Sequence, residues 1–267
     1  MPSYLVTGAN RGIGFGYLRH ISNDSANTVI GIVRDKAATE KKVAEELPGR
    51  TNIHIVEAQI TNYESLKKTV PQVSEITGGS IDYIIANAAA TGSDIPISYF
   101  AENPEKWESE TSELMQLNVT ANVHLFLLYL PLLRKGQVKK VIQISSGMAD
   151  IDMISRFQVT NGPIYSMTKA AANAVVAKFD AEYRKEGILF MSISPGFVQT
   201  SHKPATPEEL EMYAGMIAAF KSYAPDFNGP ITVDESATAV LSVIHNSSIE
   251  KGHGGAFISH KGSKQWL

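Results

Sequence analysis

Apolar residues along the chain alternate between short continuous runs and longer stripes of helical period. The short runs predict buried strands at residues 4–6, 28–33, 52–57, 81–85, 138–144, 189–194 and 255–259. Helical patterns occupy most of the intervals, at residues 13–21, 37–47, 63–77, 107–133, 164–185 and 234–244. This alternation predicts an α/β fold, in which a doubly wound parallel sheet has helices on both faces. The chain has no convincing linker, so we expect one domain over residues 1–267.

Two segments interrupt the alternation. Residues 148–163 form a longer connection than such units usually need. Residues 201–230 are predicted to be an inserted, partly helical lid over a substrate. The lid has an apolar stripe that includes Met212, Tyr213, Met216, Ile217 and Phe220. At this spacing the stripe fits core packing and a substrate wall equally well.

Charge and composition narrow the class of protein. The 267 residues have a formal net charge of −3 with no basic block, which argues against nucleic acid or an anionic membrane as the main partner. Cysteine is absent, so thiolate ligands are absent too, and we expect no metal site. The richest apolar run, residues 123–133, is interrupted by His124 and Pro131 and is too short to span a bilayer. With no signal peptide evident, we expect a cytoplasmic protein.

The first strand leads into a glycine-rich turn and then a helix. The turn contains Gly8, Gly12 and Gly14, spaced G-x-x-x-G-x-G. Glycines in this context let the backbone approach a pyrophosphate at a helix N-terminus. An ordinary tight turn is the alternative, but the position after an N-terminal strand favours a cofactor loop.

The second strand ends at Val33 and is followed by Arg34 and Asp35. An arginine here accommodates the 2′-phosphate of NADP, whereas an acidic residue binds the ribose hydroxyls of NAD. Arg11 in the glycine turn could reach the same phosphate, and two guanidiniums match a dianion well. We therefore favour NADP(H), with ribose binding by Asp35 as the alternative.

Polar residues follow other strands or lie in apolar surroundings. Asn87 follows the fourth strand, where it could either fix the strand end or contact a cofactor. Ser145 and Ser146 follow the fifth, at the strand ends where open α/β sheets bind ligands. Asn118 lies within an apolar helix, where a hydrogen-bonded core asparagine is the common case.

Tyr165 and Lys169 are four residues apart in a helical segment, so they share one helix face. A phenol has a reference pKa of about 10, and a nearby ammonium lowers it. The pair is thus a candidate general acid or base. Alone it could equally be a chance pair on a surface helix.

Together these motifs resemble the classical short-chain dehydrogenase/reductase family over essentially the whole chain. Residues 7–14 resemble its T-G-x-x-x-G-x-G cofactor loop, residues 86–89 its N-N-A-G segment, and residues 195–200 its P-G-x-x-x-T turn. A weaker likeness is to a carbonyl-reductase branch that includes fungal ketoreductases. The resemblance implies a Rossmann-type fold and a homodimer or homotetramer formed through the 107–133 and 164–185 helices.

The resemblance also implies roles for individual residues. Tyr165 would protonate the product alkoxide, Lys169 would hold the nicotinamide ribose and lower the tyrosine pKa, Ser146 would bind the carbonyl oxygen, and Asn118 would hold a water. The catalytic set would be Asn118, Ser146, Tyr165 and Lys169. Cofactor binding would involve Gly8, Asn10, Arg11, Gly12, Ile13, Gly14, Arg34, Asn87, Tyr165, Lys169, Pro195, Val198 and Thr200.

Three positions depart from the family pattern. Ala89 replaces the last glycine of N-N-A-G, and Gln59 stands where an acidic residue commonly contacts the adenine. The interval from Ser146 to Tyr165 is longer than usual, which leaves Ser145 as an alternative catalytic serine.

The sequence therefore predicts an enzyme that transfers a hydride between NADPH and the carbonyl of an apolar or aromatic small molecule. Methionines and aromatic residues in the segments 148–163 and 201–230 suggest that substrate class. A non-catalytic NADP(H)-binding sensor or scaffold, or an isomerase or cyclase on the same fold, remains an alternative.

Overall fold

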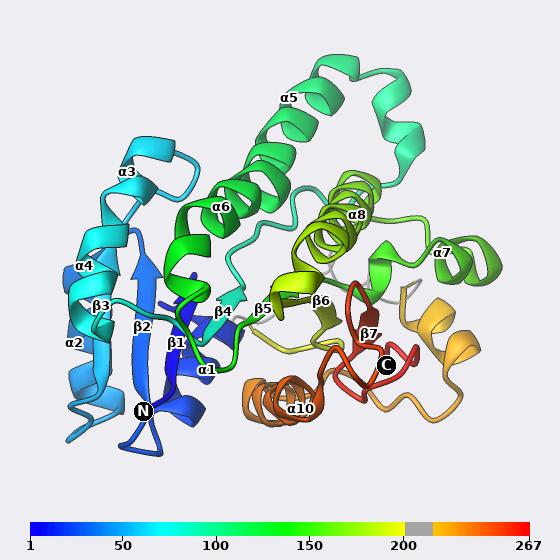
Figure 1. The fold of residues 1–267 in the computed structure, drawn as a ribbon. Coiled ribbons are helices and arrows are strands. Elements are labelled where there is room, and N and C mark those ends of the chain that lie inside the picture. The colour runs from blue at the N-terminus through cyan, green and yellow to red at the C-terminus, as the bar shows by residue number, and fades with distance from the viewer. Residues whose placement is uncertain (201–215) are drawn as a thin grey trace.

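One parallel sheet runs through a computed structural model that describes residues 1–200 and 216–267 (Figure 1). The strands follow the order β3-β2-β1-β4-β5-β6-β7. They are β1 (Ser3–Thr7), β2 (Thr28–Val33), β3 (Ile53–Glu57), β4 (Tyr83–Ala86), β5 (Lys140–Ile144), β6 (Leu189–Ser194) and β7 (Phe257–Ser259). Every paired register is parallel, which confirms the predicted doubly wound α/β fold.

Helices cover both faces of the sheet and bury the two sets of alternating strand residues separately. Tyr4 and Val6 pack with one face, whereas Leu5 between them packs with the other. The first face is covered by α1 (Gly12–Ile21), α2 (Lys36–Glu46) and α10 (Val233–Asn246). The second is covered by α3 (Tyr63–Lys67), α4 (Thr69–Thr77), α6 (Ala121–Leu133) and α8 (Pro163–Tyr183). Burial on both faces explains why the strands read as continuous apolar runs.

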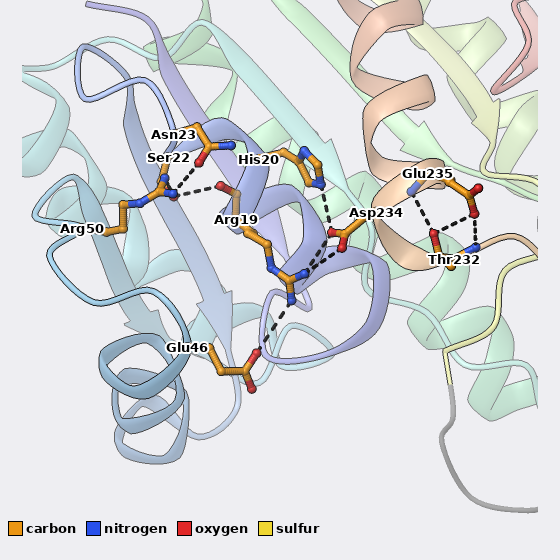
Figure 2. A network of polar contacts seen from close by, with 9 residues as sticks. All are labelled: Arg19, His20, Ser22, Asn23, Glu46, Arg50, Thr232, Asp234 and Glu235. Atoms are coloured by element: carbon orange, nitrogen blue, oxygen red, sulfur yellow. Dashed lines mark hydrogen bonds and ion pairs between the residues drawn. The ribbon is translucent and has the colours of Figure 1, made fainter.

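A polar network joins the helix after the glycine turn to its neighbours (Figure 2). The Arg19 guanidinium donates to both oxygens of Asp234, at 2.9 and 3.0 Å, and His20 Nε2 lies 3.0 Å from the same carboxylate. Arg19 also lies 3.7 Å from the Glu46 carboxylate of α2. These groups are well exposed, so the network orients α1, α2 and α10 more than it stabilises them.

Close packing fixes α1 against α10 more firmly. A Cβ at Gly16 would lie 2.6 Å from Val233 Cγ1, so the two helices meet where glycine has no side chain. The N-terminus of α10 is a capping box, in which Thr232 and Glu235 satisfy each other's backbone amides (Figure 2). The start of α10 is thereby well defined where it supports α1.

The long helix predicted at residues 107–133 begins earlier and has a π turn within it. It consists of α5 (Pro104–Met115), a π turn at Gln116–Thr120, and α6. By length and composition alone this continuous helix could cross a membrane, so the expectation that no segment is long enough was wrong. The added length comes from the polar turns of α5. The most apolar 18-residue stretch of this helix is 56% buried, and α6 packs against the sheet as a core helix does.

Two segments have local structure that their patterns do not specify. The 63–77 segment is divided at Lys68, and Pro71 sits in the first turn of α4, where a missing N–H costs nothing. The 148–163 connection contains a helix, α7 (Ile151–Phe157), preceded by a 3₁₀ turn at Gly147–Ala149. Other 3₁₀ turns lie at Ile97–Ala101 and Arg184–Glu186.

The predicted lid, residues 201–230, is described only in part. Met212 and Tyr213 lie outside the described residues. Residues 216–223 are helical, and Met216 and Phe220 are buried in an apolar cluster with Phe227 and Trp266. This half of the stripe therefore serves core packing, and a role of the segment as a lid stays a prediction.

Candidate active site

A cleft of about 700 Å³ lies at the carboxyl ends of β1 and β4. The strand order reverses between these strands, because β2 and β3 continue on one side of β1 while β4 to β7 continue on the other. Such a reversal is where open α/β sheets bind ligands. The predicted residues that line the cleft are Gly8, Asn10, Arg11, Gly12, Ile13, Arg34, Asn87, Tyr165, Lys169, Pro195 and Thr200. Gly14, Val198, Asn118 and Ser146 are not among the lining residues.

The glycine turn is tightly packed against the segment after β4. Gly8 has φ +66°, and a Cβ there would lie 2.9 Å from Ala88 Cα. A Cβ on Gly14 would lie 2.2 Å from the Gly8 carbonyl oxygen. Gly14 therefore closes the turn onto itself, while Gly8 and Gly12 leave the backbone open to the cleft. This cradle fits the pyrophosphate of a dinucleotide.

Asn87 has the structural role that its sequence position suggested, while its contact with a cofactor stays a prediction. Its side-chain amide donates to the carbonyl oxygens of Thr7 at 3.1 Å and Gly8 at 3.3 Å, which ties the end of β4 to the glycine turn. The Thr7 hydroxyl in turn accepts from the backbone amides of Asn87 and Ala88, both at 3.1 Å. Asn87 also lines the cleft, so it fixes the turn and remains accessible to a ligand.

Two arginines lie at one end of the cleft, and the neighbouring aspartate is engaged elsewhere. Arg11 and Arg34 are both exposed and both line the cleft. Over residues 1–200 and 216–267, neither forms an ion pair with a carboxylate. The Asp35 carboxylate caps α2 by accepting from the Ala38 amide at 2.9 Å, and Asp35 does not line the cleft. The donor set at this end thus suits an anionic group such as a phosphate.

Lys169 lies at the opposite end, held by the sheet. Its side chain is 1% exposed, and Nζ donates to the Ile144 carbonyl oxygen at the end of β5, at 2.8 Å. Burial disfavours the ammonium and lowers the pKa of Lys169 to about 8. Nζ lies 5.7 Å from the centre of the Tyr165 ring, one helical turn away on α8.

The pKa of Tyr165 differs from the sequence expectation. Burial of its hydroxyl raises the pKa, and interaction with the Ser146 side chain opposes that rise only in part. The expectation that Lys169 lowers this pKa was wrong for this structure. The ammonium is directed to the Ile144 carbonyl, and desolvation of the phenol outweighs any attraction between the two groups.

The two serines after β5 occupy different positions. Ser146 interacts with Tyr165, and its Oγ accepts from the Met148 amide at 3.2 Å, which begins the 3₁₀ turn. Ser145 lines the cleft, and its buried Oγ finds no hydrogen-bond partner within the described residues. Ser146 is therefore the serine placed beside the tyrosine, while the hydroxyl of Ser145 is buried.

Asn118 is buried in the π turn and is fully hydrogen-bonded. Its Oδ1 accepts from the Ala90 amide, and its Nδ2 donates to the Ala90 carbonyl and to Thr168 Oγ1, each at 3.0 Å. Its backbone carbonyl accepts from Asn122 Nδ2 at 2.8 Å. Asn118 thus links the segment after β4 to α8. This is the core role that the sequence left open.

The turn after β6 closes the cleft near the glycine turn. Thr200 lines the cleft, and its Cγ2 would lie 3.5 Å from a Cβ built on Gly12. The Pro195 carbonyl accepts from Ser236 Oγ at 2.7 Å, so α10 anchors the turn. Val198 forms an isolated β-bridge with Ile231, which accounts for its absence from the lining.

Some lining residues were not singled out from the sequence. They are Thr61, Thr91, Gly92 and Leu117. Thr61, Thr91 and Gly92 lie in segments after strands, and Leu117 is part of the π turn. No motif marks such positions, because only the strand order brings them to one edge of the sheet.

Comparison with known proteins agrees with this geometry. A family model described as short chain dehydrogenase matches residues 3–211. Short chain dehydrogenase virK of Hypocrea virens is 49% identical over 271 residues, and short-chain dehydrogenase/reductase iacC of Pestalotiopsis fici is 44% identical over 272 residues. Both alignments cover 100% of each chain.

Solved structures give the same picture. An NADPH-bound carbonyl reductase from chicken fatty liver has a TM-score of 0.78 and 26% identity, covering 98% of this chain and 93% of that one. Carbonyl reductase Sniffer of D. melanogaster also has a TM-score of 0.78, with 21% identity and 98% coverage of both chains, and so shares the fold. The protein therefore belongs to the short-chain dehydrogenase family and is an oxidoreductase.

Proposed function

We propose that this enzyme uses NADPH to reduce the carbonyl group of an apolar or aromatic small molecule, in a reversible reaction. The observation behind the proposal is that Tyr165 and the buried Lys169 both line the cofactor cleft, and that Ser146 interacts with Tyr165. NADPH would supply the hydride, and the protein would supply position and a proton.

The cofactor would lie along the cleft. Gly8 and Gly12 would face the pyrophosphate, and Arg11 and Arg34 would bind the 2′-phosphate that distinguishes NADP from NAD. The Asp35 carboxylate is already engaged as the cap of α2, which supports the preference for NADP over NAD. The related carbonyl reductase with NADPH bound supports the same cofactor.

Tyr165 would act as the general acid. Its raised pKa keeps the phenol protonated at neutral pH, as reduction requires, because the proton must be present when the carbonyl oxygen becomes an alkoxide. Ser146 would donate a hydrogen bond to that oxygen, an interaction worth about 3–4 kcal/mol in a transition state. The Lys169 ammonium would hold the ribose hydroxyls. Asn118 would act by fixing the segment at Ala90, and a water held near it stays part of the proposal.

The carbonyl compound would bind beside Ser146 and Tyr165, where the adjoining side chains are apolar. Met148, Phe157, Phe197 and Tyr223 all contact the apolar cluster next to this site. We also propose a cytoplasmic homodimer or homotetramer formed through the α5–α6 helix and α8.

The test is NADPH consumption with a panel of ketones, quinones and aldehydes, run on the wild type and Tyr165→Phe together. We expect turnover from the wild type only, with NADPH bound equally by both. Near-normal turnover by Tyr165→Phe would refute the catalytic assignment, whereas tight NADPH binding without any turnover by the wild type would favour a sensor.

Cofactor choice has its own test. Arg34→Ala should weaken NADPH binding by at least about tenfold and leave NADH nearly unchanged, because a charge-assisted hydrogen bond contributes about 1.5–3 kcal/mol. Lys36→Ala, a change of the next basic residue along the chain, serves as the matched control. Equal weakening of both cofactors by Arg34→Ala would reject the NADP preference.

A further inference from the structure

We propose that Trp266, near the C-terminus, is a positioning residue that fixes the turn carrying Ser146 and so sets the rate of carbonyl reduction. This inference rests on the proposed function for its kinetic consequence. Its physical basis is a set of contacts that join the C-terminal segment around Trp266 (the tail) to the turn that carries Ser146 (the serine turn) and to α7. Both segments lie far from the tail in the sequence (Figure 1).

The serine turn lies directly against the tryptophan. A Cβ built on Gly147 would lie 2.6 Å from Trp266 Cβ, so the turn's backbone packs on this side chain without any gap. On its other side, the Gly147 amide donates to Ser194 Oγ at the end of β6, at 2.9 Å. Ser146 is adjacent to Gly147, so the path of its backbone is fixed between β6 and the tail.

One carboxylate couples the tryptophan to the helix after the turn. Asp150 Oδ1 accepts from the amides of Asp152 at 2.9 Å and Met153 at 3.1 Å, and so caps α7. Its other oxygen, Oδ2, accepts from the Trp266 indole N–H at 2.9 Å. The tail and α7 are therefore held by opposite oxygens of the same side chain.

The tryptophan itself is firmly held. It is 2% exposed, and its ring stacks on Phe257 of β7, with 4.3 Å between centroids and 18° between planes. Its backbone amide donates to Tyr223 Oη at 3.1 Å, and that hydroxyl donates to the Lys264 carbonyl at 2.8 Å. Residues 216–223 are thus attached to the same point. A side chain so constrained can hold a neighbouring turn to within a fraction of an ångström.

The contacts act on the carbonyl side of the site alone. Trp266, Asp150 and Gly147 do not line the cofactor cleft. Loosening them should displace the Ser146 hydroxyl from the substrate oxygen and leave the phosphate and ribose contacts intact. A misplacement of about 1 Å can lower a rate by about a hundredfold, so a partial loss of order is expected to be measurable.

Two variants remove the same hydrogen bond from opposite ends. Trp266→Phe keeps a ring to stack on Phe257 and loses the indole N–H. Asp150→Ser keeps an oxygen that can cap α7 and is too short to reach the indole. Trp107→Phe is the matched control. Trp107 is the only other tryptophan in the sequence, and its ring packs against Phe100.

We expect kcat with the best ketone of the panel to fall about tenfold in Trp266→Phe and in Asp150→Ser. NADPH affinity should stay at the wild-type value, and the double variant should be no worse than either single one. Amide hydrogen exchange should accelerate across residues 145–157 and stay unchanged in the glycine turn. Trp107→Phe should show none of these effects.

An unchanged kcat in both variants, or a parallel loss of NADPH affinity, would overturn the proposal. So would exchange that accelerates uniformly, since that indicates general destabilisation. If the wild type reduced no carbonyl compound, the proposed function would fail, while the exchange pattern would still decide whether Trp266 orders the serine turn. Should Trp266→Phe fail to fold, Asp150→Ser provides the same comparison.

Discussion

Replacing Lys169 by methionine should make the protein more stable while removing its activity. The ammonium is buried and, within the described residues, donates one hydrogen bond, to the Ile144 carbonyl. Burial lowers its pKa from 10.5 to about 8, a fall that corresponds to about 3 kcal/mol of unfavourable free energy in the charged folded form. Methionine has a similar length and no charge, so Lys169→Met removes this cost.

The expected gain is smaller than the full cost, because the substitution leaves the Ile144 carbonyl without its donor. An unpaired buried acceptor costs about 1–3 kcal/mol, so at pH 7 the variant should be about 1–2 kcal/mol more stable than the wild type. The lysine penalty is fully present below the folded pKa of about 8 and disappears as pH rises toward 10.5, because the unfolded chain then also loses the proton. Between pH 7 and pH 9 the wild type should therefore gain about 1 kcal/mol relative to the variant.

The assay is urea denaturation of both proteins at pH 7, 8 and 9, with NADPH absent. Lys178→Met is the matched control, because Lys178 lies exposed on the same helix. The control should track the wild type at every pH. The reasoning is refuted if Lys169→Met is no more stable at pH 7 and its difference from the wild type stays constant up to pH 9.

Two further substitutions test the architecture of the site. Gly14→Ala should destabilise the protein by about 1–3 kcal/mol and abolish NADPH binding, because its methyl would lie 2.2 Å from the Gly8 carbonyl; a variant that binds NADPH normally in a fluorescence titration would contradict this packing. Asn118→Ala removes three hydrogen bonds that join Ala90 to Thr168 and should lower the free energy of unfolding by about 2–4 kcal/mol. Its NADPH affinity should fall as well, and unaltered stability in urea would show that the three bonds have little net effect.

The fold was predictable because each strand and helix has its own local pattern. Residues 28–33 and 189–194 were predicted with the bounds that β2 and β6 have, since short apolar runs bounded by turns have few other solutions. Many residues that line the cleft could be predicted because glycines, arginines and the Tyr165–Lys169 spacing have chemistry that short motifs express.

What the sequence could not predict depends on three-dimensional packing. The pKa of Tyr165 follows from how deeply its hydroxyl is buried, which no spacing encodes. Ribose binding by Asp35 was the alternative that the sequence left open, and Asp35 is the cap of α2; its position before a helical stripe is itself a cap signal. No pattern in the sequence marks the π turn at Gln116–Thr120. No pattern indicates either that Trp266 contacts Gly147, which lies far from it along the chain.

The strand order also determines how the chain must fold as it is synthesised. β1 lies in the interior of the sheet and is made before the other strands. One of its partners, β4, follows only after β2 and β3, with Tyr4 pairing to Tyr83. Until β4 emerges, one edge of an apolar strand has no partner, and such edges promote aggregation. Long-range parallel pairing of this kind also slows folding. Nascent chains released after β3 are therefore expected to aggregate more readily than the whole 267-residue chain.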